Sequence, residues 1–170
     1  MDTPPINKVS SASPAERGIH SANATRSSLP QRHENTVTTM NKRIMVVDDE
    51  PQVLALLDIT LRRPGFTVIK ANSAANALDL MSQQTPDLFV LDVMMPGMDG
   101  IELCRRIRAR SQTAEVPILL VSARHDPEIV RKALAAGADD CLSKLTPQYK
   151  LLLKVRQLLK IDSENSPNTQ

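Results

Sequence analysis

The sequence predicts an α/β fold in which helices cover both faces of a five-stranded parallel sheet. Short apolar runs alternate with helical patterns five times between residues 41 and 160, and this alternation is typical of parallel strands joined by crossover helices. The apolar runs are nearly continuous, which indicates strands that are buried on both faces. Crossovers of this size are right-handed. We therefore expect a doubly wound sheet with five helices.

Five segments have the length and composition of buried strands. The first, 44–47, is an unbroken aliphatic run that ends at three acidic residues. The remaining strands are expected at 66–71, 87–92, 116–122 and 140–144.

The five helices are marked by residues that favour helix starts and ends. Pro51 suits the first turn of a helix, and Pro64-Gly65 ends that helix. Ser73 suits an N-cap because its hydroxyl can accept a hydrogen bond from the first turn. Further helices are expected to follow Met98-Asp99-Gly100 and to occupy 126–136 and 147–160. Gly137 stops the fourth of them.

Composition limits the classes of function. The formal net charge is only +2, which is too balanced to indicate nucleic acid or an anionic membrane as a partner. No apolar run approaches the roughly 20 residues that span a bilayer. Cys104 and Cys141 form neither a disulfide framework nor a metal knuckle. Because the cysteines form no disulfide framework, we expect a protein of the reducing cytoplasm. We expect an aliphatic core, because aromatic residues make up 2% of the chain.

The ends of the chain differ from its middle. Residues 1–40 are rich in Ser, Thr, Pro and Asn with single apolar residues, and such a segment buries too little apolar surface to offset its ordering entropy. We expect disordered tails at 1–40 and 161–170 around one domain at 41–160. Met40 directly precedes that domain, so residues 1–39 are either a tail or a mis-assigned start.

Polar residues fall at the ends of four expected strands. Asp48 and Asp49 follow the first strand, Asp92 ends the third, Ser122 the fourth and Lys144 the fifth. In an open parallel sheet the site lies beyond the carboxyl ends of the strands, so we expect these groups to gather at one edge. Each alone is more typical of a helix cap or a solvated residue, but the combination indicates a site.

The chemistry of this set suits phosphoryl transfer. Carboxylates held close together repel each other, a divalent cation relieves the repulsion, and hard oxygen ligands suit Mg²⁺. A carboxylate such as Asp92 between a cation and Lys144 can act as a nucleophile toward phosphorus. Ser122 can donate a hydrogen bond to the phosphoryl group once it is attached.

Four motifs within residues 42–160 resemble the receiver domains of two-component response regulators. They are MVVDDEP at 45–51, DLFVLDVMMPGMDG at 87–100, PILLVSA at 117–123 and GADD at 137–140. The resemblance implies a flavodoxin-like fold with strand order 2-1-3-4-5. It implies that Asp92 is the phosphoacceptor and that Ser122 and Lys144 bind the phosphoryl group and couple it to a switch. The small Ala123 would leave room for that group. The implied Mg²⁺ ligands are Asp48, Asp49, Asp92 and the backbone carbonyl of Met94.

Two positions depart from the pattern of the receiver family. Proline usually follows the lysine, whereas Leu145 follows Lys144 here, which leaves the aim of the lysine less constrained. Family members usually place Tyr or Phe, whose rotation reports phosphorylation, where this chain has Cys141. Cys141 cannot act as a large aromatic lever, so we expect phosphoryl acceptance with an altered readout.

The leading hypothesis is a stand-alone response regulator that accepts phosphate from a sensor histidine kinase or a histidine phosphotransfer protein. It would then bind an unknown downstream protein, and it would catalyse its own phosphorylation without being a turnover enzyme. The alternative is a pseudo-receiver that binds partners without phosphate. An aspartyl phosphatase would need an acid where Met94 stands, and a flavin protein would need a phosphate-binding loop where the acidic run stands.

Two expectations about the surface and one about the rate of hydrolysis follow from single residues. Leu153 and Tyr149 share the outward side of the last helix, which suggests a partner surface or a homodimer. Arg105, Arg106, Arg108 and Arg110 are expected to form a solvated basic face. The Met94 side chain cannot orient an attacking water, so we expect the acyl phosphate to hydrolyse slowly.

Overall fold

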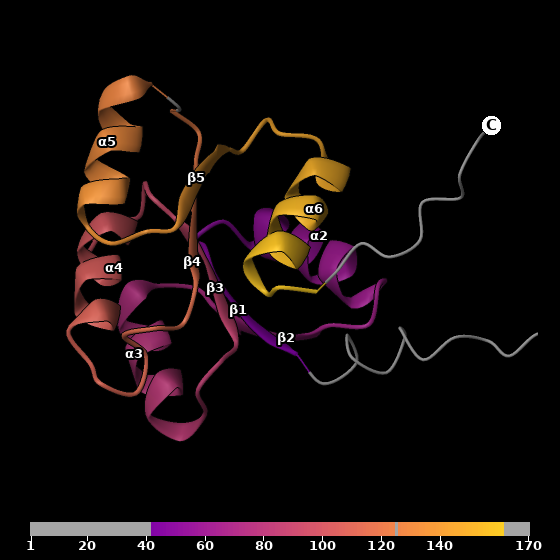
Figure 1. Ribbon diagram of the computed structural model, residues 1–170, viewed down its shortest axis with the longest axis horizontal. Helices are drawn as coiled ribbons and strands as arrows, with labels where there is room; N and C mark the ends of the chain where they lie inside the picture. Colours follow the sequence, from indigo (N-terminus) through magenta and orange to yellow (C-terminus); the bar gives the residue numbers. More distant parts are fainter. Residues whose placement is uncertain (1–41, 125, 162–170) are drawn as a thin grey trace, which may run out of the picture. The chain divides into compact units, whose positions relative to one another are not determined.

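The computed structural model describes residues 42–124 and 126–161. Within them, five strands and five helices alternate along the chain. The strands form one parallel sheet in the order β2-β1-β3-β4-β5 (Figure 1). The α/β class, the five helices and the strand order expected from the sequence are confirmed.

Element boundaries agree with the sequence to within a few residues. The strands are β1 (Arg43–Val47), β2 (Thr67–Ala71), β3 (Leu88–Asp92), β4 (Ile118–Ser122) and β5 (Asp140–Ser143). The helices are α2 (Pro51–Arg62), α3 (Ala74–Gln83), α4 (Gly100–Arg108), α5 (Pro127–Ala135) and α6 (Gln148–Leu158). The expected strands extend slightly beyond the observed ones, since Phe66 precedes β2, Pro117 precedes β4 and Lys144 follows β5.

The three central strands are buried because helices cover both faces of the sheet. Every residue of β3 and β4 is buried, as are the last four of β1. The edge strands are less protected, and Thr67 and Lys70 of β2 are exposed. Continuous apolar runs therefore correspond to the middle of the sheet, as the sequence indicated.

Two hydrophobic cores lie on opposite faces of the sheet. Helices α3, α4 and α5 pack on one face, and α2 and α6 on the other (Figure 1). The first core contains Phe89, Leu91 and Leu120 from the strands. The second contains Val46, Leu88 and Val90, against which Leu151 and Val155 of α6 pack. Alternate residues of one strand thus enter different cores.

Three helices begin at a polar side chain that caps them. Ser73, Asp99 and Asp126 each accept a hydrogen bond from the backbone N–H three residues later. Such caps stabilise a helix by about 1 kcal/mol each. Helix α2 instead begins with Pro51, whose missing N–H needs no partner in the first turn. The expected roles of Ser73 and Pro51 at helix starts are confirmed.

Helices α5 and α6 each end in a left-handed residue. Gly137 has φ +98° after α5, and the N–H groups of Gly137 and Ala138 donate to the carbonyls of Leu134 and Ala133. Lys160 has φ +53° after α6, and Ile161 N–H donates to Arg156 O at 2.9 Å. Both are Schellman-type endings, although a side chain at Lys160 makes that conformation less favourable than it is for glycine.

The expectation of a solvated arginine face is wrong for Arg108. Its side chain is only 21% exposed, and the guanidinium donates to the carbonyls of Gly137 and Val116 at 2.8 and 2.6 Å. It also pairs with Asp139 at 2.8 Å, and Asp139 in turn accepts the N–H of Ile118. Arg108 therefore joins the end of α4 to the turns that precede β4 and β5, whereas the other three arginines of the run are exposed.

The remaining expectations concern the surface and the chain ends. Leu153 and Tyr149 are exposed on α6. The expected tails at 1–40 and 161–170 lie outside the described residues, except for Ile161, which packs against the second core. None of the described helices combines the length and apolarity needed to cross a membrane.

Candidate functional site

The carboxyl ends of the strands bring the predicted polar residues to one edge of the sheet. Val47 pairs with Leu91, so Asp48 follows β1 at the level where Asp92 ends β3. Asp92 pairs with Val121, and Ser122 with Ser143. Lys144 follows β5 directly, and its N–H donates to the carbonyl of Ser122 at 2.8 Å.

Three carboxylates meet at this edge. One oxygen from each of Asp48, Asp49 and Asp92 lies within 4.8 Å of the others. Asp48 and Asp92 are only 2% exposed, whereas Asp49 lies nearer the surface. Asp48 is fixed from both sides, because its N–H donates to Ala71 O and its carboxylate accepts the N–H of Glu50 at 2.9 Å.

The Asp92 carboxylate lacks the hydrogen bonds that a buried carboxylate requires. Neither of its oxygens has a hydrogen-bond partner among the described residues. Burial raises the pKa of Asp92, and the neighbouring charge of Asp48 raises it further, while the Lys144 ammonium and the backbone of Met94 oppose the shift. A buried anion without donors is costly. A cation between the three aspartates would relieve this cost, so the donor set fits a hard divalent ion such as Mg²⁺.

Lys144 places its ammonium among the carboxylates. The Nζ atom lies 2.8 Å from Asp48 Oδ2, 3.0 Å from Glu50 Oε1 and 3.3 Å from Asp92 Oδ1. Burial alone would lower the pKa of Lys144, but the hydrogen bonds and charges of Asp48, Glu50 and Asp92 outweigh burial and raise it. Lys144 thus stays charged and points into the acidic cluster although Leu145 follows it.

Sequence reasoning did not assign a role to Glu50. It completes the Asp48-Asp49-Glu50 run, and the structure places its Oε1 atom 3.0 Å from the Lys144 Nζ atom, closer than Asp92 Oδ1 at 3.3 Å. Position alone could not reveal this contact, because Glu50 and Lys144 are 94 residues apart. The signal that could have indicated this contact is that Glu50 is the third consecutive acid of a run predicted to lie near Lys144.

Ser122 and its neighbours form the wall of the site beyond Asp92. Ser122 is fully buried at the end of β4, and its Oγ accepts the N–H of Arg124 at 3.2 Å. Ala123 is exposed beside it. The Met94 side chain is half exposed, and its backbone lies next to the Asp92 carboxylate. The role of the Met94 carbonyl as a metal ligand stays a prediction.

Cys141 lies away from this edge. It occupies the inward face of β5 in the core shared with α3, α4 and α5, and it is 4% exposed. Burial raises the pKa of its thiol, and the nearby charge of Asp140 raises it further. Cys141 therefore packs as a small buried side chain, and its part in a switch stays a prediction.

Gly100 holds α4 close to the backbone of Asp92. A Cβ at this position would lie 2.0 Å from the carbonyl oxygen of Asp92, a distance that no real side chain tolerates. The Gly100 N–H donates to Val93 O at 3.0 Å. Only glycine allows the first turn of α4 to pack this closely behind the acidic cluster.

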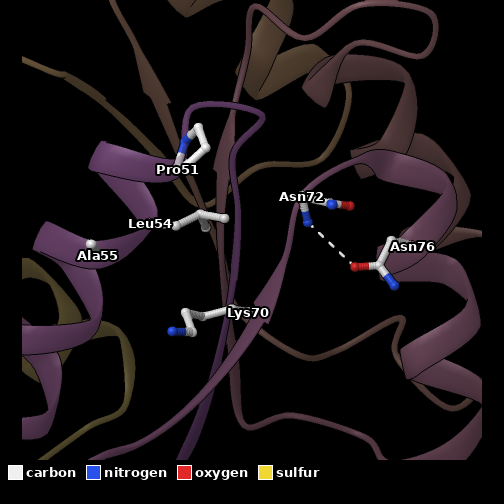
Figure 2. A pocket seen from close by; sticks show the side chains of 6 residues that line it. All are labelled: Pro51, Leu54, Ala55, Lys70, Asn72 and Asn76. Atoms are coloured by element: carbon white, nitrogen blue, oxygen red, sulfur yellow. Dashed lines mark hydrogen bonds between the residues drawn. The ribbon is translucent and has the colours of Figure 1, made fainter.

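A separate hollow lies along the outer edge strand β2 (Figure 2). It encloses about 280 Å³ and is lined by Pro51, Leu54, Ala55, Lys70, Asn72 and Asn76. The Asn72 N–H donates to Asn76 Oδ1 at 3.3 Å, and Lys70 reaches Asp58 at 3.6 Å. None of its lining side chains is acidic, so this hollow is distinct from the carboxylate cluster.

Known proteins share both the sequence and the fold of this chain. The chain is 37% identical over 131 residues to the alkaline phosphatase synthesis transcriptional regulatory protein PhoP of Bacillus subtilis, covering 77% of this chain and 54% of that protein. It is 40% identical over 122 residues to the DNA-binding response regulator MtrA of Mycolicibacterium smegmatis, covering 72% of this chain and 52% of that protein. The chain therefore spans about half the length of the curated relatives it matches.

A solved structure gives the same result. A response regulator from Chloroflexus aurantiacus superposes with a TM-score of 0.68 at 34% identity, covering 70% of this chain and 98% of that one. The sequence model of the response regulator receiver domain matches residues 44–156. With its five-stranded parallel sheet and acidic edge, the chain belongs to the response regulator receiver domain family.

Proposed function

We propose that this chain accepts a phosphoryl group on Asp92 from a phosphohistidine of a sensor histidine kinase or of a histidine phosphotransfer protein. One observation carries the proposal. The Asp92 carboxylate is buried between two other aspartates and an ammonium, and neither of its oxygens has a hydrogen-bond partner among the described residues. This arrangement leaves an oxygen of Asp92 available to react, and family membership makes phosphoryl acceptance the natural use for it.

The reaction would proceed by direct displacement. An Asp92 oxygen attacks phosphorus, the bond from phosphorus to the histidine nitrogen breaks, and that nitrogen keeps the electron pair. The product is an acyl phosphate on Asp92. Lys144 would neutralise one of the phosphoryl oxygens, and Ser122 would donate its hydroxyl hydrogen to another. The small, exposed Ala123 leaves space beside them.

The cation would be held by the carboxylates of Asp48, Asp49 and Asp92 and by the Met94 carbonyl. Bound there, Mg²⁺ would supply positive charge to the phosphoryl oxygens. Asp48 is prepared for this role because its backbone and carboxylate are already fixed by hydrogen bonds. We also propose that the chain only phosphorylates itself and slowly loses the phosphoryl group, rather than turning over a substrate.

The proposed output is a change in protein–protein interactions. The curated relatives named above are a transcriptional regulatory protein and a DNA-binding response regulator, and this chain spans about half their length, so a stand-alone role stays a prediction. A homodimer through the exposed Leu153 and Tyr149 on α6 is one possible route to an output. A pseudo-receiver remains the alternative, and the small buried Cys141 is the observation that favours it.

The proposal is tested with an acyl-phosphate donor and Mg²⁺. We expect intact-mass spectrometry to show a gain of one phosphoryl group in the wild-type chain and no gain in Asp92→Asn. The matched control is Asp79→Asn, which removes an exposed carboxylate from α3 and should leave the mass gain intact. A wild-type chain that gains no mass, or an Asp92→Asn variant that still does, contradicts the proposal and favours the pseudo-receiver.

A further inference from the structure

Three carboxylates surround the Lys144 ammonium at unequal distances. The two shorter contacts of its ammonium are with Asp48 at 2.8 Å and Glu50 at 3.0 Å, and the longest is with Asp92 at 3.3 Å. That longest contact gives neither Asp92 oxygen a hydrogen bond. The ammonium therefore lies closer to Asp48 and Glu50 than to the proposed nucleophile.

Glu50 is well placed to hold the ammonium because its own backbone is fixed. It is the N-cap residue of α2, its N–H donates to Asp48 Oδ1 at 2.9 Å, and its carbonyl accepts the N–H of Leu54 at 3.1 Å. Its side chain is 59% exposed, so the carboxylate reaches Lys144 from the solvent side. The contact then costs only the rotamer freedom of two side chains.

The position of the Lys144 ammonium depends on contacts at the tip of the side chain more than on the loop that follows β5. The backbone of Lys144 is held by Ser122 O, but the next residue, Leu145, is 88% exposed and packs against little. The long lysine side chain therefore needs a contact at its tip to keep one position. Asp48 and Glu50 supply such contacts at 2.8 and 3.0 Å, and Glu50 does so from outside the aspartate cluster.

We propose that Glu50 is a positioning residue whose contact with the Lys144 ammonium, here called the tether, holds the ammonium off Asp92 and so keeps the Asp92 oxygens available to the cation. This inference rests on the proposed function of the site. Without the tether, the ammonium would keep its contact with Asp48 and could move closer to Asp92 Oδ1, where it would compete with Mg²⁺ for the Asp92 oxygens. Removing Glu50 also leaves one carboxylate fewer to attract the cation, so both effects weaken Mg²⁺ binding.

Two substitutions separate the tether from simple charge. Glu50→Gln keeps the length of the side chain and removes its charge. Glu50→Asp keeps the charge but withdraws the carboxylate by about 1.5 Å, the length of one carbon–carbon bond, which breaks the contact with Lys144. Glu128→Gln is the matched control, because Glu128 is an exposed acid that pairs with Lys132 on α5.

Two measurements on the full chain test the inference. Calorimetric titration with MgCl₂ is expected to show binding weakened about five-fold in Glu50→Gln, from the loss of one nearby charge and of the tether. Glu50→Asp is expected to lose most of the same affinity, and Glu128→Gln to match the wild type. In the metal-free proteins, the NMR signals of the Lys144 Cε and Nζ groups should move in both Glu50 variants and stay unchanged in Glu128→Gln.

The outcomes distinguish this inference from the proposed function. Unmoved Lys144 signals in both variants overturn the tether, whatever the wild type does with phosphate. A Mg²⁺ affinity of Glu50→Gln within two-fold of the wild type overturns it as well. If Glu50→Asp keeps the wild-type affinity while Glu50→Gln loses it, the effect comes from the charge of Glu50 and not from its contact with Lys144, and the tether is overturned. A failure of the proposed function would instead appear as absent phosphorylation of the wild type at Asp92, with the Lys144 signals still moving in the variants.

Discussion

Replacing Gly100 with alanine is expected to force α4 away from the backbone of Asp92. The new Cβ would lie 2.0 Å from the Asp92 carbonyl oxygen and 2.8 Å from its carbonyl carbon. A carbon–oxygen contact needs at least about 3.3 Å, so the helix must move by roughly 1 Å or more. The clash is with backbone of β3, which cannot rotate away.

The magnitude follows from overpacking against a rigid neighbour. Such insertions cost about 3 kcal/mol, and the better helix propensity of alanine returns at most about 1 kcal/mol. The movement also strains the hydrogen bond from Gly100 N–H to Val93 O. We therefore expect Gly100→Ala to lower the free energy of unfolding by about 2 kcal/mol or more.

Urea denaturation measures this loss, with Gly97→Ala as the control. Gly97 has φ +77°, and nothing lies within 4 Å of a Cβ there, so its substitution costs only about 1 kcal/mol of backbone strain. Because Gly100 positions the segment behind Asp92, Gly100→Ala should also reduce the yield of the phosphorylated chain. A Gly100→Ala variant that is as stable as Gly97→Ala, or more stable, would refute the steric argument.

Three further results are expected. Burial raises the pKa of the Cys104 thiol to about 11, so at pH 8 only about a thousandth of it is thiolate; iodoacetamide should leave Cys104 unmodified in the native chain by mass spectrometry, and labelling within minutes would contradict this. Lys160→Gly should raise the free energy of unfolding by about 0.5–1 kcal/mol, because glycine adopts the left-handed end of α6 without strain; a loss of stability in urea would show that the lysine side chain has another role. Arg108→Ala should cost about 2–4 kcal/mol, because it leaves several carbonyls and Asp139 without their donor, while Arg105→Ala should cost less than about 0.5 kcal/mol; equal losses in thermal unfolding would contradict the difference in burial.

The sequence was sufficient for the fold because local and long-range signals agree. The apolar runs at β1, β3 and β4 are unbroken, and these strands are the ones buried on both faces. Caps such as Ser73 mark helix starts through contacts three residues away, which a sequence shows directly. Strand ends are less well marked, because Lys144 has nothing local that distinguishes it from the last residue of β5.

Part of the site could not be predicted, because it depends on contacts between distant segments. The aspartates share an edge because parallel strands share a direction, so Asp48 and Asp92 could be placed from their positions at strand ends. The Glu50–Lys144 contact joins a helix start to the end of the sheet, and no local pattern specifies it. Arg108 is a similar case: its run of arginines suggested solvent, and only the three-dimensional turn around Gly137 shows why this one is enclosed.

The contacts of Arg108 lie at one end of the sheet only. They tie α4 to the turns before β4 and β5 at the amino ends of these strands, opposite the aspartates. At the carboxyl ends, Lys144 N–H donates to Ser122 O, and Arg124 N–H donates to Ser122 Oγ. A charge added at Asp92 would therefore act at the edge of the sheet opposite the Arg108 contacts, which would continue to join α4 to the amino ends of β4 and β5.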